Sequence, residues 1–378
     1  MPRNIIICCD GTDNQFGKAN TNVVRMAQVA KQDSSTQIVY YDPGIGTLPE
    51  PTAKTKVAKW LSRTKALAFG TDIDDKVAIA YSHLMDFWKP GDSVYIFGFS
   101  RGAYTARVLG GMLHTVGLLP AGNQHLLPYA RRIYKSLRSN NKGAWDLCDQ
   151  FRWSFARPVA DDDTDRRFPI HFIGLWDTVS SIGWIWNPKR FQFTFRNPSL
   201  KIVRHAVSLD ERRTGFRENL FADVTGQDMQ QRWFAGVHDD VGGGNPPSDG
   251  GIWRVTFGWI LDEAKKAGFI VDDERLKLVL ADPPAKPWAE PIHESLTGIW
   301  WLPEYLLPKK VYDAQTKTSH WELGRGRHRF VPEGSSIPWP VLQRIREMDY
   351  SPPNLSDSFR AKVKALPSIP DTLEYHAV

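Results

Sequence analysis

A serine with a glycine two positions away on each side is the most chemically informative feature of the sequence. The segment Gly98-Phe99-Ser100-Arg101-Gly102 follows an apolar, β-branched run and precedes a helical pattern rich in Ala and Leu. The order strand, sharp turn, helix is that of a nucleophile elbow, whose crowded turn leaves no room for side chains beside the nucleophile. The sequence therefore predicts Ser100 as a nucleophile. The alternative is a glycine-rich turn that only packs a helix on a sheet.

The predicted turn also supplies a means of stabilising negative charge. Ser100 would lie at the N-terminus of a helix, where backbone N–H groups have no partner within the helix. The N–H of Arg101 is then the first expected donor to an oxyanion. A second donor is expected from Gly11 or Thr12, on the loop after the first predicted strand, and Asp10 is expected to orient that loop through backbone hydrogen bonds.

An acid and a base follow the serine at two further predicted strand ends. The buried-strand pattern Ile170–Trp176 leads to Asp177, and Arg232–Val237 leads to His238 on a glycine-rich loop. The chain order nucleophile, acid, base is that of α/β-hydrolases. In such a triad the imidazole takes the serine proton, while the carboxylate fixes the tautomer of the imidazole and stabilises its charged form.

The acidic neighbours of His238 offer alternatives to Asp177. Asp239 is poorly placed, because adjacent residues of an extended segment point to opposite faces. Asp240 could curl back on the turn before Gly242–Gly244, and otherwise it braces that loop. A metal site of His238 with both aspartates lacks a further ligand cluster. We expect Asp177 to be the acid, Asp240 to be a supporting residue, and no metal to be bound.

The elements that must place these residues form an α/β pattern. A fully apolar run such as Ile5–Cys9 indicates a strand covered on both faces. Helical patterns at 72–88 and 252–266 alternate with such runs. The sequence predicts a mostly parallel sheet flanked by helices, similar to that of the α/β-hydrolases.

Two insertions and a C-terminal region surround the predicted sheet. We expect residues 1–275 to form the hydrolase core, with insertions at about 44–70 and 118–168 that form a cap. The first insertion carries Trp60 and Phe69 and is a candidate flap over the site. Residues 276–378 are rich in Pro and Trp and carry no catalytic pattern of their own, so they are expected to cover the core.

Composition narrows the class of protein. A hydrophobic share of 42% and a charged share of 24% are those of an ordinary soluble globular protein. The net charge of +6 is spread along the chain, which argues against a nucleic-acid partner. No run approaches the roughly 20 apolar residues of a membrane helix, and no leader precedes the first strand. We expect synthesis and folding in the cytoplasm, and any export to use a route without a signal peptide.

The same segments resemble a known family, the uncharacterised DUF2235 domain of α/β-hydrolases, which includes the Tle1-type phospholipase effectors of type VI secretion. The resemblance extends nearly to the C-terminus and is carried by CDGTDN at Cys9, DPGIGT at Asp42, GFSRGAYTAR at Gly98, GLWDTV at Gly174, LDERR at Leu209, WFAGVHDDVGGG at Trp233, ESLTGIWWLPEYL at Glu294 and SPPNL at Ser351. It places the family triad on Ser100, Asp177 and His238. It implies cleavage of acyl esters in phospholipids.

These observations lead to one expected activity and two alternatives. We expect a serine hydrolase that needs no cofactor and acts on lipids or phospholipids. The aromatic residues Trp60, Phe69, Trp300 and Trp301, with the modest basic charge, favour peripheral contact with a membrane surface; the alternative is that these aromatics are core residues. The alternatives are an esterase or thioesterase that acts on small soluble acyl substrates, and a non-catalytic binding module on a hydrolase scaffold.

Overall fold

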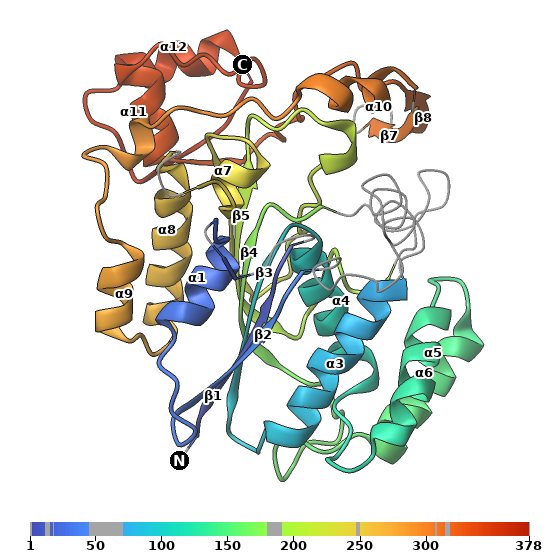
Figure 1. Ribbon diagram of the computed structural model, residues 1–378. Coiled ribbons are helices and arrows are strands. Elements are labelled where there is room, and N and C mark those ends of the chain that lie inside the picture. Colours follow the sequence, from blue (N-terminus) through green and yellow to red (C-terminus); the bar gives the residue numbers. More distant parts are fainter. Residues whose placement is uncertain are drawn as a thin grey trace, which may run out of the picture.

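The computed structural model describes residues 2–11, 16–17, 19–44, 71–179, 191–246, 250–306, 308–313 and 318–377. In these ranges the main sheet has the strand order β10-β9-β6-β5-β4-β3-β1-β2. All neighbouring strands in it are parallel, except that β10 is antiparallel to β9. Helices cover both faces of this sheet (Figure 1). The predicted α/β fold is confirmed.

The strands have the following bounds: β1 (Asn4–Cys9), β2 (Gln37–Asp42), β3 (Ser93–Phe99), β4 (Ile170–Trp176), β5 (Leu200–Ser208), β6 (Asp228–Phe234), β9 (Ser336–Pro338) and β10 (Thr372–Glu374) in the main sheet, and β7 (Lys309–Asp313) and β8 (Thr318–Glu322) in a separate antiparallel pair. The α-helices are α1 (Asn22–Val29), α3 (Thr71–Phe87), α4 (Ser100–Val116), α5 (Leu127–Ser136), α6 (Lys142–Phe155), α7 (His238–Gly242), α8 (Ile252–Lys266), α9 (Asp273–Val279), α10 (Trp301–Leu306), α11 (Trp339–Glu347) and α12 (Asp357–Ala365). Short 3₁₀ turns are η1 (Gln124–Leu126), η2 (Thr214–Phe216), η3 (Pro287–Ala289) and η4 (Gly298–Trp300).

The apolar run of β1 is buried because helices pack against both faces of the strand. Ile5 and Ile7 lie in the core on the side of α3 to α6, whereas Ile6 and Cys8 lie in the core on the side of α1, α8 and α9. This alternation follows from the two-residue period of a strand.

No helix of the described residues is long and apolar enough to cross a lipid bilayer.

The order of the strands reverses direction at one place in the sheet. β1 pairs with β2 on one side and with β3 on the other, so the direction in which the chain crosses the sheet reverses there. Ligands of open α/β sheets bind at such a switch point, outside the carboxyl ends of the strands. Asp10 follows β1 and Ser100 follows β3. The topology therefore places both residues at this switch point.

The predicted insertions have different outcomes. The insertion at about 118–168 forms α5 and α6, which pack along α4. Tyr134 lies against Gly111, and Arg152 donates a hydrogen bond to the carbonyl of Thr115, at the end of α4 opposite to Ser100. These helices thus cover one face of the sheet. The insertion at about 44–70, with Trp60 and Phe69, lies outside the described residues, apart from Gly44.

The C-terminal region extends the main sheet beyond β6. β9 pairs with β6, and β10 pairs with β9 at the edge. Ile337 and Leu342 pack in one cluster with Val207 of β5 and Trp233 of β6. The boundary near residue 275 stays a prediction, and a shared sheet and core join the residues on its two sides.

Candidate active site

Ser100 lies at a strained turn between a strand and a helix. β3 ends at Phe99, and Ser100 is the first residue of α4. Its φ angle of 58° lies in the left-handed region, which is unfavourable for residues other than glycine. The side chain is largely buried, with 7% of the residue exposed. This is the backbone conformation that the elbow pattern predicts.

The two glycines of the elbow are required by close backbone contacts. A Cβ atom at Gly98 would lie 2.7 Å from the Cα of Ala103. A Cβ atom at Gly102 would lie 2.2 Å from the carbonyl oxygen of Cys9 and 2.4 Å from that of Asp10. The first turn of α4 therefore packs directly on the end of β1, which brings the Asp10 loop beside the elbow.

Asp177 and His238 are in direct contact at the same edge of the sheet. Asp177 follows β4 with a φ angle of 39°, and its Oδ2 lies 2.5 Å from Nδ1 of His238. The imidazole ring packs on Phe99, with the ring centroids 4.6 Å apart, so it lies next to the residue that precedes Ser100. The N–H of Val179 also donates to the carbonyl of Ser100. The structure thus brings the three predicted residues to adjoining positions.

His238 begins a short helix, whereas the sequence places it on a loop. α7 spans His238–Gly242 and follows β6 after a tight connection at Gly236. Asp240 accepts hydrogen bonds from the backbone N–H of Val237 at 3.0 Å and from Nδ1 of His293 at 2.5 Å. Its carboxylate therefore caps α7 and fixes the start of the helix that carries His238.

Among the described residues, no three His, Cys, Asp or Glu side chains gather in a way that could hold a metal ion.

A buried arginine from the C-terminal region pairs with Asp177. Nη1 of Arg329 lies 2.5 Å from Oδ1 of Asp177, and Nη2 lies 3.0 Å from Oδ2. Burial alone would raise the pKa of Asp177, but Arg329 and the hydrogen bond with His238 hold that pKa well below its usual range. Asp177 is therefore ionised at neutral pH although it is fully buried.

Glu211 supports the backbone on which His238 lies. Its carboxylate accepts hydrogen bonds from the backbone N–H of His238 at 3.2 Å, from Nε of Arg213 at 3.0 Å and from Oγ of Ser295 at 2.9 Å. Burial opposes the charge, yet the bond and charge of Arg213 lower the pKa of Glu211 to about 2. Sequence reasoning assigned no role to Glu211 or Arg329. The only signal for Glu211 was its place in the segment LDERR.

The loop after β1 is held by Asp10. Oδ1 of Asp10 accepts hydrogen bonds from the N–H of Gly11 at 2.7 Å and from Thr21 at 2.8 Å, and Oδ2 accepts one from the hydroxyl of Tyr41. Burial raises the pKa of Asp10 to about 6. The Gly11 N–H donates to Asp10 here, so this hydrogen bond must break before the same N–H can donate to an oxyanion. Thr12 lies outside the described residues.

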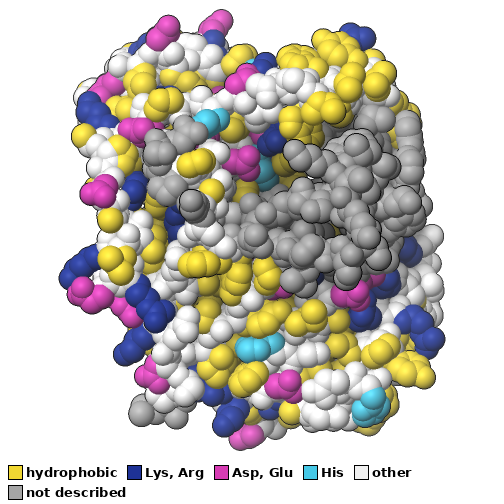
Figure 2. Space-filling model, in the orientation of Figure 1, with side chains coloured by type: hydrophobic (Ala, Val, Ile, Leu, Met, Phe, Trp, Pro, Cys, Tyr) yellow, Lys and Arg dark blue, Asp and Glu magenta, His cyan; other side chains and the backbone are white. Residues whose placement is uncertain are grey.

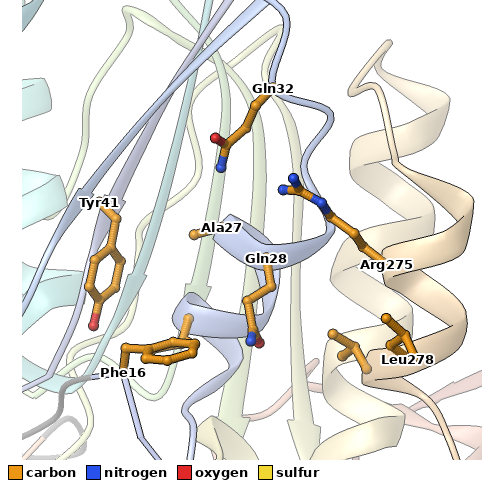
Figure 3. A pocket seen from close by; sticks show the side chains of 9 residues that line it. Phe16, Ala27, Gln28, Gln32, Tyr41, Arg275 and Leu278 are labelled. Carbon is orange, nitrogen blue, oxygen red and sulfur yellow. The ribbon is translucent and has the colours of Figure 1, made fainter.

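A groove on the other side of the Asp10 loop is separate from these residues. It lies between α1 and α9, has a volume of about 460 Å³, and is lined by side chains that include Phe16, Tyr41 and Leu278 (Figure 3). Ser100, Asp177 and His238 are not among its lining residues. The groove is therefore distinct from the candidate active site.

Comparison with known proteins identifies similar sequences. A family described as "T6SS, Phospholipase effector Tle1-like, catalytic domain" matches residues 3–263, a range that contains Ser100, Asp177 and His238. An uncharacterised protein of Saccharomyces cerevisiae, YEL023C, is 37% identical over 233 residues, which are 59% of this chain and 33% of that protein. The chain thus spans about a third of the length of this curated relative.

Two solved structures are also similar in part. A crystal structure of an uncharacterised protein from Pseudomonas aeruginosa aligns with a TM-score of 0.41 and 18% identity, over 72% of this chain and 46% of that one. A Tle1 effector bound to the VgrG spike of the type VI secretion system aligns with a TM-score of 0.34 and 19% identity, over 65% of this chain and 52% of that one. The chain spans about half the length of each.

Proposed function

Because the chain belongs to the family of Tle1-like phospholipase effector catalytic domains, we propose that it is a serine hydrolase that cleaves acyl esters of phospholipids. Family membership supports a hydrolase of the lipase or phospholipase type. The observation that carries the serine mechanism is the contact between Asp177 and His238 beside the strained turn at Ser100. A nucleophile, a base and an acid that follow parallel strands of one sheet, at the same edge, are the parts that acyl transfer needs.

In the proposed reaction, the Ser100 hydroxyl attacks the ester carbonyl while Nε2 of His238 takes its proton. Asp177 accepts the Nδ1–H of the imidazole, which leaves Nε2 free to act as the base, and it stabilises the imidazolium that forms. The imidazolium then protonates the leaving alcohol, and the acyl group stays on Ser100. Water deprotonated by His238 attacks this acyl ester, which releases the fatty acid and restores the serine.

The negative charge of the tetrahedral intermediate requires backbone donors. We assign the first to the backbone N–H of Arg101, which follows Ser100 in the first turn of α4. We assign the second to Gly11 or Thr12, which follow Asp10, and Gly102 allows Asp10 to approach α4 closely. In this proposal Asp10 holds the loop in place, and it releases the Gly11 N–H if that group is the donor.

An exposed apolar strip offers a surface for lipid next to this site. The strip consists of six large side chains on η4 and α10, namely Ile299, Trp300, Trp301, Leu302, Tyr305 and Leu306. Hydrophobic side chains gather there in Figure 2, at the place where Figure 1 shows α10. A contiguous exposed patch of this kind is typical of a protein or membrane contact.

A buried residue of α10 anchors the strip to the protein, and an aromatic side chain connects the strip to the proposed base. The fully buried Glu304 of α10 accepts hydrogen bonds from the backbone N–H and hydroxyl of Thr214. On the same turn, Phe216 contacts both His238 and Trp300, with ring centroids 4.9 Å and 5.7 Å apart. The Phe216 ring therefore lies between the proposed base and Trp300 of the strip, so the strip is close to the candidate active site.

Charges beside the strip favour an anionic lipid surface. Arg325 and Arg327 are exposed in the segment that borders α10, where the N–H of Arg325 donates to the carbonyl of Glu304 and Arg327 pairs with Glu322 at 2.6 Å. Arginines near an apolar surface attract anionic headgroups. Together with the net charge of +6, they support peripheral binding to a membrane as the way in which the enzyme reaches its substrate.

The test is hydrolysis of vesicles made of phosphatidylglycerol and phosphatidylethanolamine, with products identified by mass spectrometry. The purified chain should release a fatty acid and a lysophospholipid, and Ser100→Ala should fold normally and lose at least roughly 10³-fold in rate. Turnover of soluble short-chain esters alone would indicate the small-substrate esterase instead. No turnover of either substrate, or full activity of Ser100→Ala, would contradict the proposal.

A further inference from the structure

Arg329 lies outside the part of the chain that matches the family, yet it contacts the proposed catalytic acid. The family match ends at residue 263. The Arg329 side chain is 2% exposed, and its guanidinium group donates to both carboxylate oxygens of Asp177. It also donates to the carbonyl oxygens of Ser208, at the end of β5, and Phe216, on η2. A residue of the C-terminal region is thus bonded to three elements of the candidate site.

Asp177 needs a permanent positive partner because of where it lies. Its carboxylate is fully buried, and a buried carboxylate without a partner becomes protonated rather than ionised. His238 cannot supply the charge at rest, because a general base must be neutral before it takes the serine proton. Arg329 can, since a guanidinium stays charged throughout the proposed reaction.

We propose that Arg329 is a positioning residue that orients the Asp177 carboxylate toward His238 and keeps it ionised, so that the C-terminal region completes the catalytic machinery. This inference rests on the proposed function, in which His238 is the base. It assigns to residues 276–378 a part in the chemistry beyond covering the core. The bidentate geometry matters because an arginine fork fixes the plane of a carboxylate, which a single point charge does not.

The guanidinium also acts on the proton affinity of the pair that Asp177 forms with His238. Oδ2 of Asp177 accepts hydrogen bonds from both His238 and Arg329. Part of the negative charge that would stabilise the imidazolium is therefore shared with a cation. Removal of that cation should let the Asp177–His238 pair hold a proton to a higher pH, because a nearby positive charge disfavours the protonated form of both groups.

Other charged groups near this pair set the background for such a shift. Glu211 accepts a hydrogen bond from the backbone of His238, and Arg213 pairs with Glu211. Glu218 lies 3.7 Å from Nε of Arg329. His205 is fully buried beyond Asp177, and burial lowers its pKa to about 3, so it stays neutral. These groups are the same in the wild type and in the variants below, so differences between them report on Arg329.

The experiment compares Arg329→Gln and Arg329→Lys with a matched control, Arg204→Gln, in the full chain. Arg204 is also buried and pairs with carboxylates, at 2.6 Å from Glu263 and 2.9 Å from Asp228, but it has no contact with Asp177, Ser100 or His238 among the interactions of the described residues. The measurements are the pH profile of Ser100 labelling by a fluorophosphonate, and the melting temperature.

Arg329→Gln should label roughly 10²-fold more slowly, and the acidic midpoint of its profile should move up by about one pH unit or more. Arg329→Lys should keep the midpoint near that of the wild type and lose part of the rate. Arg204→Gln should melt lower with an unchanged midpoint. If Arg329→Gln melts lower and keeps the wild-type midpoint, Arg329 is only structural and the inference is wrong.

Two further readouts keep the inference testable. If Arg329→Gln does not fold, Arg329→Lys gives the test. A reduced rate of Ser100 labelling supports the requirement for a bidentate guanidinium at Asp177, and a wild-type labelling rate contradicts it. If wild-type Ser100 is unreactive, the proposed function fails, and the ¹⁵N NMR titration of the His238 ring still tests Arg329. A higher titration midpoint in the Arg329 variant supports the inference in that case, and an equal midpoint overturns it.

Discussion

At the scale of single residues, two aspartates each contact a histidine, and their surroundings give them different roles. Asp177 contacts Nδ1 of His238, whereas Asp240 contacts His293 and the N–H of Val237. The first contact fixes the proposed base, and the second caps α7. The expectation that Asp177 is the acid stays a prediction, and this geometry favours it over Asp240.

Asp177→Asn should reduce turnover by roughly 10²- to 10⁴-fold, as acid substitutions do in other triads. It should also lower the melting temperature, because Arg329 would lose its buried carboxylate. Sequence reasoning alone, which does not reveal Arg329, predicts no such loss of stability. Asp240→Asn should lower the melting temperature and affect turnover far less. A larger loss of turnover in Asp240→Asn than in Asp177→Asn would assign the acid role to Asp240.

The sequence identified residues with a local pattern and missed residues that act over long separations. Ser100 was predicted because its glycines and the flanking strand and helix are adjacent in the chain. Arg329 pairs with a carboxylate 152 positions away, and nothing near it distinguishes it from other arginines. Glu211 similarly supports His238 from 27 positions away. Such contacts become visible only when the topology of the sheet is known.

At the scale of elements, long periodic segments were predictable and short ones were not. The structure has β4 and α8 with the bounds that the sequence patterns predict, Ile170–Trp176 and Ile252–Lys266. In contrast, α7 has five residues, which is too short for a helical period to appear in the sequence. The sequence therefore placed His238 on a loop.

The apolar strip on α10 makes a prediction for this element. The double variant Leu302→Ser with Leu306→Ser should bind anionic vesicles at least about tenfold more weakly. Burial of a leucine side chain in lipid is favourable by roughly 1.5–3 kcal/mol, and each substitution removes that contribution. Its turnover of a soluble ester should not change. The measurements are vesicle co-sedimentation and the two hydrolysis rates.

The control for the strip is Leu278→Ser, because Leu278 is a leucine on α9, away from α10, that is more exposed than Leu302 and Leu306. That variant should bind vesicles as the wild type does. If all three proteins bind vesicles equally, the strip is not the membrane contact. Equal losses in both variants would indicate that binding depends on general surface hydrophobicity.

At the scale of the whole molecule, the C-terminal region belongs to the same folded unit as the site, since it adds strands to the main sheet and Arg329 to Asp177. The sequence predicted a region that covers the core. It could not predict the added strands, because β9 and β10 have three residues each and carry no alternating pattern. Their place in the sheet depends on partners that are distant in sequence.

The stability of the whole chain should fall in acid partly through Glu211. Its folded pKa of about 2 lies below its ordinary value of 4.5, so the ionised group stabilises the fold above about pH 4.5. This contribution is lost as the pH falls toward 2. Glu211→Gln should therefore be less stable than the wild type by about 3 kcal/mol at pH 7, with a difference that shrinks below pH 4.5. Urea unfolding at several pH values measures the difference in the free energy of unfolding between the two proteins. A difference that is constant with pH would contradict the lowered pKa of folded Glu211.

The central claim is that Ser100 is a nucleophile activated by His238 and Asp177, and covalent labelling tests it most directly. The folded chain is treated with a fluorophosphonate, and the modified residue is located by mass spectrometry of its peptides. We predict one adduct, on Ser100, which is absent in the urea-unfolded chain and strongly slowed in His238→Gln. Labelling at another residue, or no labelling of folded protein that retains lipid hydrolysis, would contradict the account.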